Sequence, residues 1–389
     1  MERKKSESFN YGLAFTLLLF FIISCIAIYN AQKTGQYSTN FVIKQVEWYA
    51  VGIGIIFITM RPDEEQWDRF TWFFYGLNIF ILILLIVSPQ SIAPVKNGAK
   101  SWFVLPGIGS IQPSEFTKIS LILAFSKVIR NHNEKFRVRD IRSDVLLVGK
   151  LGATLAVPIL LIMQQPDLGT ALVMIFLFFV MIFVSGVSFK LILPTFTSII
   201  GIASGILYMV LNHPKILEKY LHVQSYQFDR IYAWFDPESY AGSLSYNYMQ
   251  VLKAIGAGSI SGRDTSKFSV YVPEKHSDFI FSAIGESYGF LGTSLILFLF
   301  MVLIYQIITV AFHTKDQFST YICTGVISIV FFHVLENVGM CIGLLPITGI
   351  PLPFISYGGS ALMSTMFLMG LVLNISFQSK AYMFDQDVR

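Results

Sequence analysis

The sequence predicts an all-α, polytopic membrane protein with about ten transmembrane helices. Hydrophobic residues make up 54% of the 389-residue chain and charged residues only 13%, and long apolar runs recur along it. Soluble domains carry about 25% charged residues, whereas a bilayer core about 30 Å thick needs about 20 mostly apolar residues per helix. The runs are continuous and do not alternate as barrel strands do. An α-helical bundle is therefore the predicted fold class.

Ten apolar windows are the predicted spanning helices. In chain order they cover 10–30, 41–60, 68–88, 113–131, 145–164, 168–187, 190–212, 279–312, 319–345 and 355–378. No small-residue cleavage site closes the first window, so we interpret it as a retained helix and not as a signal peptide. Cys25, Cys323 and Cys341 lie inside windows, where a thiol is usually a small buried hydrophobe. They predict no disulfide framework and no metal site.

The distribution of basic residues predicts the orientation. With a cytoplasmic N-terminus, the even-numbered connections at 61–67, 131–144, 188–190 and 313–318 and the C-terminus also lie inside. The densest basic cluster, "RNHNEKFRVRDIR" at 130–142, then falls in an inner connection, as the positive-inside rule requires. The net charge of +4 therefore needs no nucleic-acid partner. We predict a multi-pass protein of the cytoplasmic membrane with both termini cytoplasmic.

Two longer connections, 89–112 and 213–277, face outward in this topology. We expect residues 1–389 to form a single membrane domain, with 213–277 as a large extracellular loop between the seventh and eighth helices. Loops of this length are usually functional or disordered, and this one is too aromatic for disorder. Its "SYNYMQVLKAIG" piece has helical spacing. The aromatic residues fit an interfacial belt or contact with a sugar or partner, and both remain open.

Ionisable residues inside the windows are candidates for a functional site. Glu115 and Lys118 share one face of the fourth helix. They form either a structural ion pair or a site where Lys118 meets an anionic head group. Asp167, in "QQPDLGTA", is predicted to cap the sixth helix. His333 and Glu336 share a face of the ninth helix and predict a hydrogen-bonded pair, since two residues are too few for a metal site.

Asp278 is the last charge before an apolar run in "YVPEKHSDFIFSAIGESYGF" at 271–290. It precedes the eighth helix as an N-cap would. A carboxylate at a boundary between water and lipid also suits a general base that acts on a hydroxyl. The residues alone leave both roles open. The glycine-rich "GAGSISG" at 256–262 lacks a preceding strand, so we reject a nucleotide-binding loop there.

Four stretches together resemble one known family. They are "NGAKSWFVLPGIGSIQPSEFTK" at 97–118, "QQPDLGTA" at 164–171, "VPEKHSDFIFSAIGESYGFLG" at 272–292 and "GLLPITGIPLPFISYGGSALMSTM" at 343–366. In this order they resemble the SEDS proteins (shape, elongation, division, sporulation), which include FtsW, RodA and SpoVE. Within the family the chain is most similar to RodA, and the match runs from the first helix to the last.

The resemblance implies a ten-helix enzyme that polymerises lipid II, a lipid-diphosphate-linked disaccharide-pentapeptide, into glycan strands outside the membrane. The family's acidic catalytic residue corresponds to Asp278 and its outer-loop tryptophan to Trp102. Its Gln-Pro-Ser-Glu-x-x-Lys motif corresponds to Gln112 through Lys118. The implied partners are a class B penicillin-binding protein, whose transpeptidase crosslinks the strands, and other cell-wall synthesis machinery. Many relatives carry Arg before the tryptophan, whereas this chain has Ser101, which leaves Lys100 as the nearest cation.

The implied reaction assigns roles to these residues. A sugar hydroxyl attacks an anomeric carbon, and Asp278 takes its proton. The leaving diphosphate needs positive charge, for which Lys118, Arg230 and Lys100 are candidates. Trp102 and Glu115 complete the predicted substrate-binding set. A divalent cation such as Mg²⁺ is a candidate helper, although no metal ligands are predicted in the chain.

Two other functions fit the same helices. A lipid II flippase needs a polar path across the bilayer, along which Lys118, Lys127, Arg130 and Lys150 would be stations. These residues cluster toward the two surfaces, which favours the enzyme. A non-catalytic scaffold of the elongation or division machinery tolerates the helices but does not require Asp278.

Overall fold

A computed structural model confirms the ten predicted helices. It describes residues 9–33, 35, 39–95, 99–105, 109–138, 140–212, 225–237, 243–264 and 269–386. The ten are α2 (Tyr11–Gln32), α3 (Phe41–Thr59), α4 (Glu64–Val87), α5 (Pro113–Lys135), α6 (Ile141–Met163), α7 (Leu168–Val184), α8 (Phe189–Asn212), α12 (Ile280–His313), α13 (Gln317–Cys341) and α14 (Gly359–Gln386). Within the described residues, seven helices are long and apolar enough to cross a membrane, and α7 is a shorter apolar helix.

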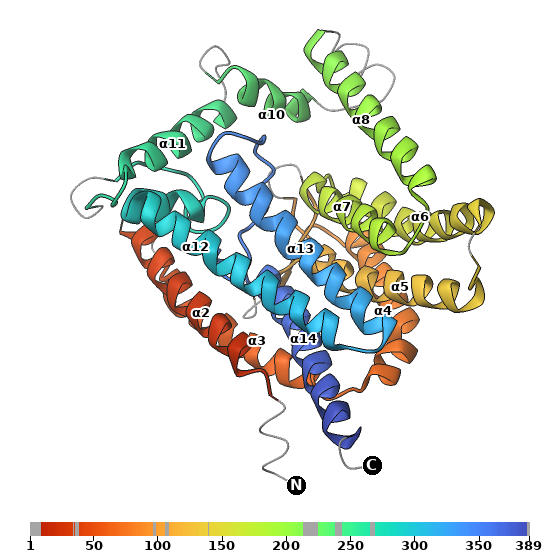
Figure 1. The fold of residues 1–389 in the computed structure, drawn as a ribbon. Helices are drawn as coiled ribbons and strands as arrows, with labels where there is room; N and C mark the ends of the chain where they lie inside the picture. Colours follow the sequence, from red (N-terminus) through yellow and green to blue (C-terminus); the bar gives the residue numbers. More distant parts are fainter. Residues whose placement is uncertain are drawn as a thin grey trace.

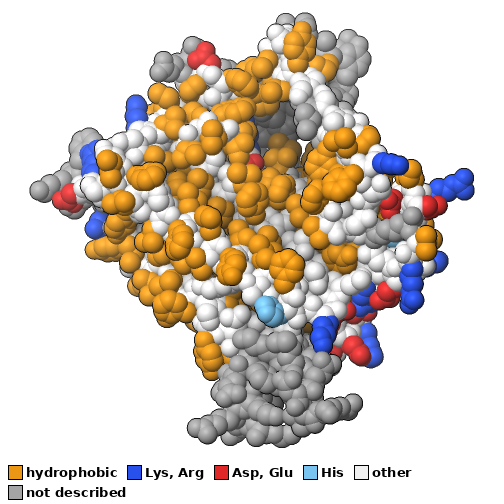
Figure 2. All heavy atoms as spheres, viewed as in Figure 1, with side chains coloured by type: hydrophobic (Ala, Val, Ile, Leu, Met, Phe, Trp, Pro, Cys, Tyr) orange, Lys and Arg blue, Asp and Glu red, His pale blue; other side chains and the backbone are white. Residues whose placement is uncertain are grey.

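The long helices pack side by side, with the start of α2 and the end of α14 at one end of the bundle and α10 and α11 at the other (Figure 1). On the face shown in Figure 2, hydrophobic side chains cover most of the surface and charged ones gather toward its edges. Large apolar residues such as Phe57, Phe73 and Phe298 are more than half exposed. A soluble protein rarely exposes apolar surface on this scale, so these faces are the ones that meet lipid.

Other helices lie largely inside the protein, as the candidate spans of α13 and α14 show, and α5 is one of them. It packs against α4, α6, α7, α13 and α14. Ser114, Thr117, Lys118 and Ser120 are all buried along it. Polar groups at membrane depth are tolerated where they face the interior of a bundle. This central position explains how a helix of such mixed polarity lies in the middle of an apolar protein.

The connection predicted as 89–112 contains a hairpin that the sequence analysis did not predict. The strands β1 (Phe103–Leu105) and β2 (Gly109–Ile111) pair antiparallel, with Phe103 opposite Ile111. Strands this short give little periodicity to detect. The hairpin lies between Trp102 and the start of α5.

The predicted loop 213–277 is partly helical. It contains α10 (Ser225–Phe235) and α11 (Ser243–Gly258), so the expected helix in "SYNYMQVLKAIG" is confirmed. Trp234 Nε1 and Tyr248 Oη both donate hydrogen bonds to the carbonyl oxygen of Gly343, at 3.1 and 3.2 Å. These two aromatic residues therefore attach α10 and α11 to the segment that follows α13.

The helix α12 is broken at Gly289, where φ is 61° and ψ is −155°. An unbroken helix of 34 residues would be about 51 Å long, well beyond the hydrocarbon thickness. The loop that follows α11 satisfies the backbone at the break, because Phe290 N donates to Ser259 O at 3.0 Å and Leu291 N to Ile260 O at 3.1 Å. The break divides the candidate span Ile280–His313, and residues 290–313 after it are by themselves long enough to cross a bilayer.

Glycine is required where this loop meets α12, and we expect Gly262→Ala to destabilise the protein by about 2–4 kcal/mol. Gly262 has φ +87°, and a Cβ there would lie 2.1 Å from the carbonyl oxygen of Ser287. Thermal unfolding in detergent should show a lower midpoint. Gly256→Ala is the matched control, because nothing lies within 4 Å of its Cβ position and alanine favours a helix. Equal unfolding midpoints for the two variants would contradict the requirement for glycine at position 262 of "GAGSISG".

Candidate functional site

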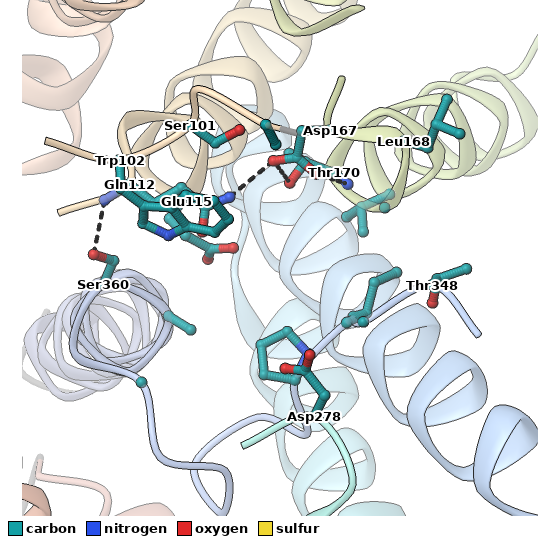
Figure 3. Close-up of a pocket in the computed structure, with 18 of the residues that line it drawn as sticks. Ser101, Trp102, Gln112, Glu115, Asp167, Leu168, Thr170, Asp278, Thr348 and Ser360 are labelled. Atoms are coloured by element: carbon teal, nitrogen blue, oxygen red, sulfur yellow. Dashed lines mark hydrogen bonds between the residues drawn. The ribbon is translucent and has the colours of Figure 1, made fainter. Parts of the chain in front are cut away.

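A pocket of about 340 Å³ collects most of the predicted site residues. Its wall includes Trp102 beside the hairpin, Glu115 and Lys118 from α5, Arg230 from α10, and Asp278 just before α12. In Figure 3, Asp278 lies across the pocket from Trp102 and Asp167. Segments nearly 180 residues apart in sequence therefore meet at one site.

Asp278 faces this pocket and does not cap a helix. The N-cap of α12 is Phe279, without a side-chain hydrogen bond, so the N-cap interpretation of Asp278 is wrong. The carboxylate is directed into the pocket (Figure 3), and a Cβ at Gly349 would lie 3.3 Å from Oδ2. Glycine at that position keeps the approach to Asp278 open.

The environment of Asp278 changes its acidity. The side chain is half-buried, yet it lies deep enough among protein atoms for desolvation to dominate. Burial, with a smaller contribution from the charge of Glu274, raises the pKa of the Asp278 carboxyl to about 7, against the opposing effect of Arg230. A carboxyl with this pKa is balanced between its two protonation states near neutral pH, as suits a general base.

Asn337 on α13 fixes the backbone around Asp278. Its Nδ2 donates to the carbonyl oxygen of Asp278 at 2.7 Å and to that of Ile350 at 2.8 Å. One buried amide thus joins the loop before α12 to the loop before α14. Asn337 is not among the predicted site residues, although an amide inside an apolar helix was a usable signal.

The loop before α14 is buried, which corrects the predicted start of the last helix from 355 to Gly359. Tyr49 Oη donates to Phe354 O at 2.7 Å, and Ser24 Oγ to Ile355 O at 2.8 Å. A buried loop needs partners of this kind for its carbonyl groups. The segment therefore lies inside the bundle without helical hydrogen bonds and lines the pocket.

Lys118 is held between two side chains at the base of the pocket. Its Nζ lies 2.9 Å from Glu115 Oε1 and 3.1 Å from His333 Nε2. His333 Nδ1 is 3.2 Å from the Pro351 carbonyl oxygen, which can only accept, so Nδ1 carries the proton and Nε2 accepts from Lys118. Ser364 Oγ donates to Glu115 Oε2 at 2.8 Å. The predicted Glu115–Lys118 pair is present, and it lies in the pocket wall.

The predicted hydrogen bond between His333 and Glu336 is absent. His333 instead binds Lys118 and the Pro351 carbonyl group, while Glu336 Oε2 is buried without a hydrogen-bond partner among the described residues. Shared helical spacing placed both residues on one face, but the tertiary partners of His333 come from other segments.

Asp167 is the N-cap of α7, as predicted. Oδ1 accepts from Thr170 N at 3.1 Å, and Oδ2 accepts from Thr170 Oγ1 and from Gln112 Nε2, both at 2.8 Å (Figure 3). These bonds occupy the carboxylate and attach the start of α5 to that of α7. Asp167 therefore shapes the pocket wall and is a poor candidate for a base.

The two remaining predicted cations differ in position. Arg230 lines the pocket, with Nη1 3.5 Å from the Thr348 carbonyl oxygen. Lys100 does not line it, because its Nζ donates to Ile86 O at 2.8 Å and also to Ser88 O. These carbonyl groups end α4, where unpaired acceptors attract a cation. This position gives no support to the assignment of Lys100 to the substrate site, which stays a prediction.

A buried ion pair that the sequence analysis missed anchors the segment before Asp278. Lys275 and Glu286 form it, and both side chains are almost completely buried. Glu286 also accepts from Val270 N at 2.8 Å and from Ser269 Oγ at 3.1 Å. Both residues lie in the 272–292 stretch, but Lys275 is in a turn, where helical spacing gave no signal. The pair holds the approach to Asp278 against the first part of α12.

Comparison with known proteins agrees with this architecture. A model of the cell cycle protein family FtsW/RodA/SpoVE matches residues 8–381. Stage V sporulation protein E of Bacillus subtilis (strain 168) is 33% identical, over 97% of this chain and 99% of its own. Peptidoglycan glycosyltransferase MrdB of Escherichia coli (strain K12) is 30% identical, over 92% and 91%.

A solved structure shares the fold as well. It is a chain from a study of how a peptidoglycan synthase complex coordinates polymerization and crosslinking. The two chains are 25% identical and align with a TM-score of 0.72, over 95% of this chain and 98% of the other. The shared fold and the matches along the whole sequence agree. The chain belongs to the FtsW/RodA/SpoVE family of multi-pass membrane proteins.

Proposed function

We propose that this protein is a peptidoglycan glycosyltransferase that polymerises lipid II into glycan strands at the outer face of the cytoplasmic membrane. The observation that carries the proposal is one pocket with Asp278 on one side and the cations Lys118 and Arg230 also in its wall. Glycosyl transfer from a lipid diphosphate needs these two kinds of group. The family relatives that are named peptidoglycan glycosyltransferases support it.

Asp278 would act as the general base. The attacking sugar hydroxyl gives its proton to the carboxylate as its oxygen bonds to the anomeric carbon of the second sugar, and the bond from that carbon to the diphosphate breaks. Glycosidases need a second carboxyl to protonate a poor leaving group. A diphosphate leaves already stabilised as an anion, so one acid–base residue suffices.

Lys118 and Arg230 would offset the charge that develops on the diphosphate. Lys118 is fixed by Glu115 and His333, so it needs little reorganisation during the reaction, and such preorganised charge stabilises a transition state. Arg230 presents a planar fork of donors suited to phosphate oxygens. Trp102 would contact the sugar from the hairpin side of the pocket.

The expected help from Mg²⁺ does not fit a resident metal site. Within the part of the chain that the structure describes, no group of three or more histidine, cysteine or carboxylate residues could hold a metal ion. Asp167 and Glu115 are occupied by other partners. The cationic side chains are therefore assigned the electrostatic role, and a chelator added to the polymerisation assay would test for a metal that arrives with the substrate.

The proposal includes a transpeptidase partner and an orientation. The structural relative comes from a synthase complex that couples polymerization with crosslinking, so we propose that this chain also binds a class B penicillin-binding protein. The pocket would face outward, with both termini cytoplasmic. Cysteine-accessibility labelling of intact cells at the connections of α2–α3 and α13–α14, compared with the C-terminus, tests the orientation.

The flippase alternative finds little support along α5. Lys127 Nζ lies 3.1 Å from Asp68 Oδ2, and Arg130 Nη2 lies 2.9 Å from Asp68 Oδ1. Between these groups and Lys118 the helix is buried and mostly apolar, with only Ser120 and Ser126 as polar residues. The deciding experiment gives the purified protein labelled lipid II, alone and with its transpeptidase. Long glycan strands support the proposal, and translocation in vesicles without polymer would favour the flippase.

Asn337 offers a test of how the base is positioned. We expect Asn337→Asp to lower kcat for polymerisation by about 10²-fold, because it removes two donors that hold the loops around Asp278, and small misplacements carry losses of this size. KM for lipid II should change much less. Steady-state kinetics separate the two parameters.

The control for Asn337 lies on the same helix. Ser328 is buried on α13, and its hydroxyl has no hydrogen-bond partner among the described residues. Ser328→Ala should leave kcat and stability close to wild type. Wild-type turnover by Asn337→Asp would exclude the positioning role.

A further inference from the structure

A second, larger pocket adjoins the first one. It has a volume of about 800 Å³, within the range of ligand sites. Residues of α3, the hairpin and the segment before Asp278 line it, and it shares Trp102, Tyr357 and Gly359 with the first pocket. We name it the vestibule. Apart from Glu274, whose charge contributes to the raised pKa of Asp278, its other residues have no role in the mechanism proposed above.

Trp48 of α3 forms part of its wall. A Cβ at Gly359 would lie 2.5 Å from the indole of Trp48, so only glycine lets the start of α14 approach the ring this closely. With Trp102 and Tyr357, the vestibule has three aromatic side chains along its border with the first pocket. Rigid aromatic rings with a polar tip are well suited to ligands that have both apolar and polar faces.

The charge of the vestibule differs from that of the first pocket. Lys44 is its only Lys or Arg among the described lining residues, against Glu47 and Glu274. His276 also lines it; its ring stacks on Phe41 with centroids 4.1 Å apart, and burial lowers its pKa, so it adds no cation at neutral pH. One cation beside two carboxylates gives the vestibule no net positive charge that would attract a diphosphate. The chemistry fits an uncharged, hydroxyl-rich ligand whose groups can hydrogen-bond to carboxylates.

We propose that the vestibule is a carbohydrate subsite that holds amino-sugar units of the glycan against Trp48 and Trp102. This inference rests on the proposed function and extends it. One reacting sugar, with its diphosphate, would occupy the first pocket near Lys118 and Arg230. The glycan in the vestibule would continue from it, past the shared wall at Trp102 and Tyr357.

Binding without turnover tests the subsite. The Asp278→Asn protein in detergent is titrated with labelled peptidoglycan oligosaccharides that lack both lipid and diphosphate. We expect saturable binding, about tenfold weaker after Trp48→Ala, because loss of one aromatic contact of about 1.4 kcal/mol corresponds to that factor. Trp48→Phe should retain most of the affinity. Trp72→Ala is the control. Trp72 lines neither pocket, so this variant should bind the oligosaccharides as tightly as the Asp278→Asn parent does.

The outcomes separate this proposal from the function on which it rests. The expected preference for a tetrasaccharide over a disaccharide identifies the growing strand as the occupant and supports the subsite, whereas equal affinity for the two would contradict a strand that continues from the first pocket. Absence of binding, or equal affinity in Trp48→Ala, overturns it even if the wild type makes polymer. If binding depends on Trp48 but the wild-type protein makes no polymer from lipid II, the subsite is retained and the polymerase function is refuted.

Discussion

Asp278→Asn is expected to lower the rate of glycan polymerisation by about 10²–10⁴-fold, the contribution of a positioned general base. Asparagine keeps the size of the side chain but cannot take a proton from the attacking hydroxyl. The assay is the formation of long strands from labelled lipid II by the purified protein together with its transpeptidase.

The fold should survive this substitution. Among the described residues, none donates a hydrogen bond to the Asp278 carboxylate that asparagine would break. Asn337 binds the backbone carbonyl group of Asp278, which the substitution leaves in place. We therefore expect an unchanged or slightly raised unfolding midpoint, since a partly desolvated charge is removed. Polymer at the wild-type rate from Asp278→Asn would eliminate the general-base mechanism, whereas a lowered midpoint would make the activity result uninformative and call for Asp278→Ala.

The raised pKa of Asp278 also predicts a pH dependence. Because burial raises this pKa to about 7, the base is protonated below pH 7, and the rate should fall about tenfold per pH unit there and level off above.

The contribution of Asp278 to the free energy of unfolding depends on pH with the opposite sign. A carboxyl with a folded pKa above its unfolded value of about 3.9 stabilises the fold as pH falls from about 7 toward 4. Glu274→Gln should move the acid limb to lower pH, because Glu274 contributes to the raised value.

The sequence predicted the fold well because bilayer thickness acts on every spanning segment alike. Each of the ten windows contains a helix, although α5 is enclosed by protein and α12 is broken at Gly289. These two differences depend on neighbours. Which helix lies at the centre of a bundle, and where a chain must bend to accept a loop such as 259–263, is decided by packing that a single window does not contain.

The residues of the site were partly predictable from local sequence motifs. Asp278, Lys118 and Trp102 lie in recognisable stretches, and the structure brings them to one pocket. Lys100 does not line this pocket, because a cation next to a predicted site residue can equally bind the end of a helix, as it does at α4. Asn337 binds backbone carbonyl groups. An amide inside an apolar helix marks this position in the sequence, but the identity of the distant carbonyl groups that it binds leaves no pattern there.

The two interpretations of Lys118, structural ion pair and anion site, can be separated by charge removal. Lys118→Met should destabilise the protein by about 3–5 kcal/mol, because it leaves Glu115 buried without its cation and His333 Nε2 without its donor. The single variant therefore cannot distinguish the roles, since loss of fold and loss of charge both abolish polymer formation.

The double variant Glu115→Gln/Lys118→Met makes the distinction. It removes both charges together, and replacing a whole buried ion pair is often neutral for stability, so we expect an unfolding midpoint near wild type. If Lys118 only neutralised Glu115, polymerisation would return with the fold. We expect instead that it stays at least about 10²-fold below wild type, as when a preorganised electrostatic group is lost, and that lipid II binds more weakly. Because the neutral pair preserves the packing between α5 and α13, a folded but inactive double variant assigns the positive charge at Lys118 to the leaving diphosphate, and a folded, active one assigns it to structure alone.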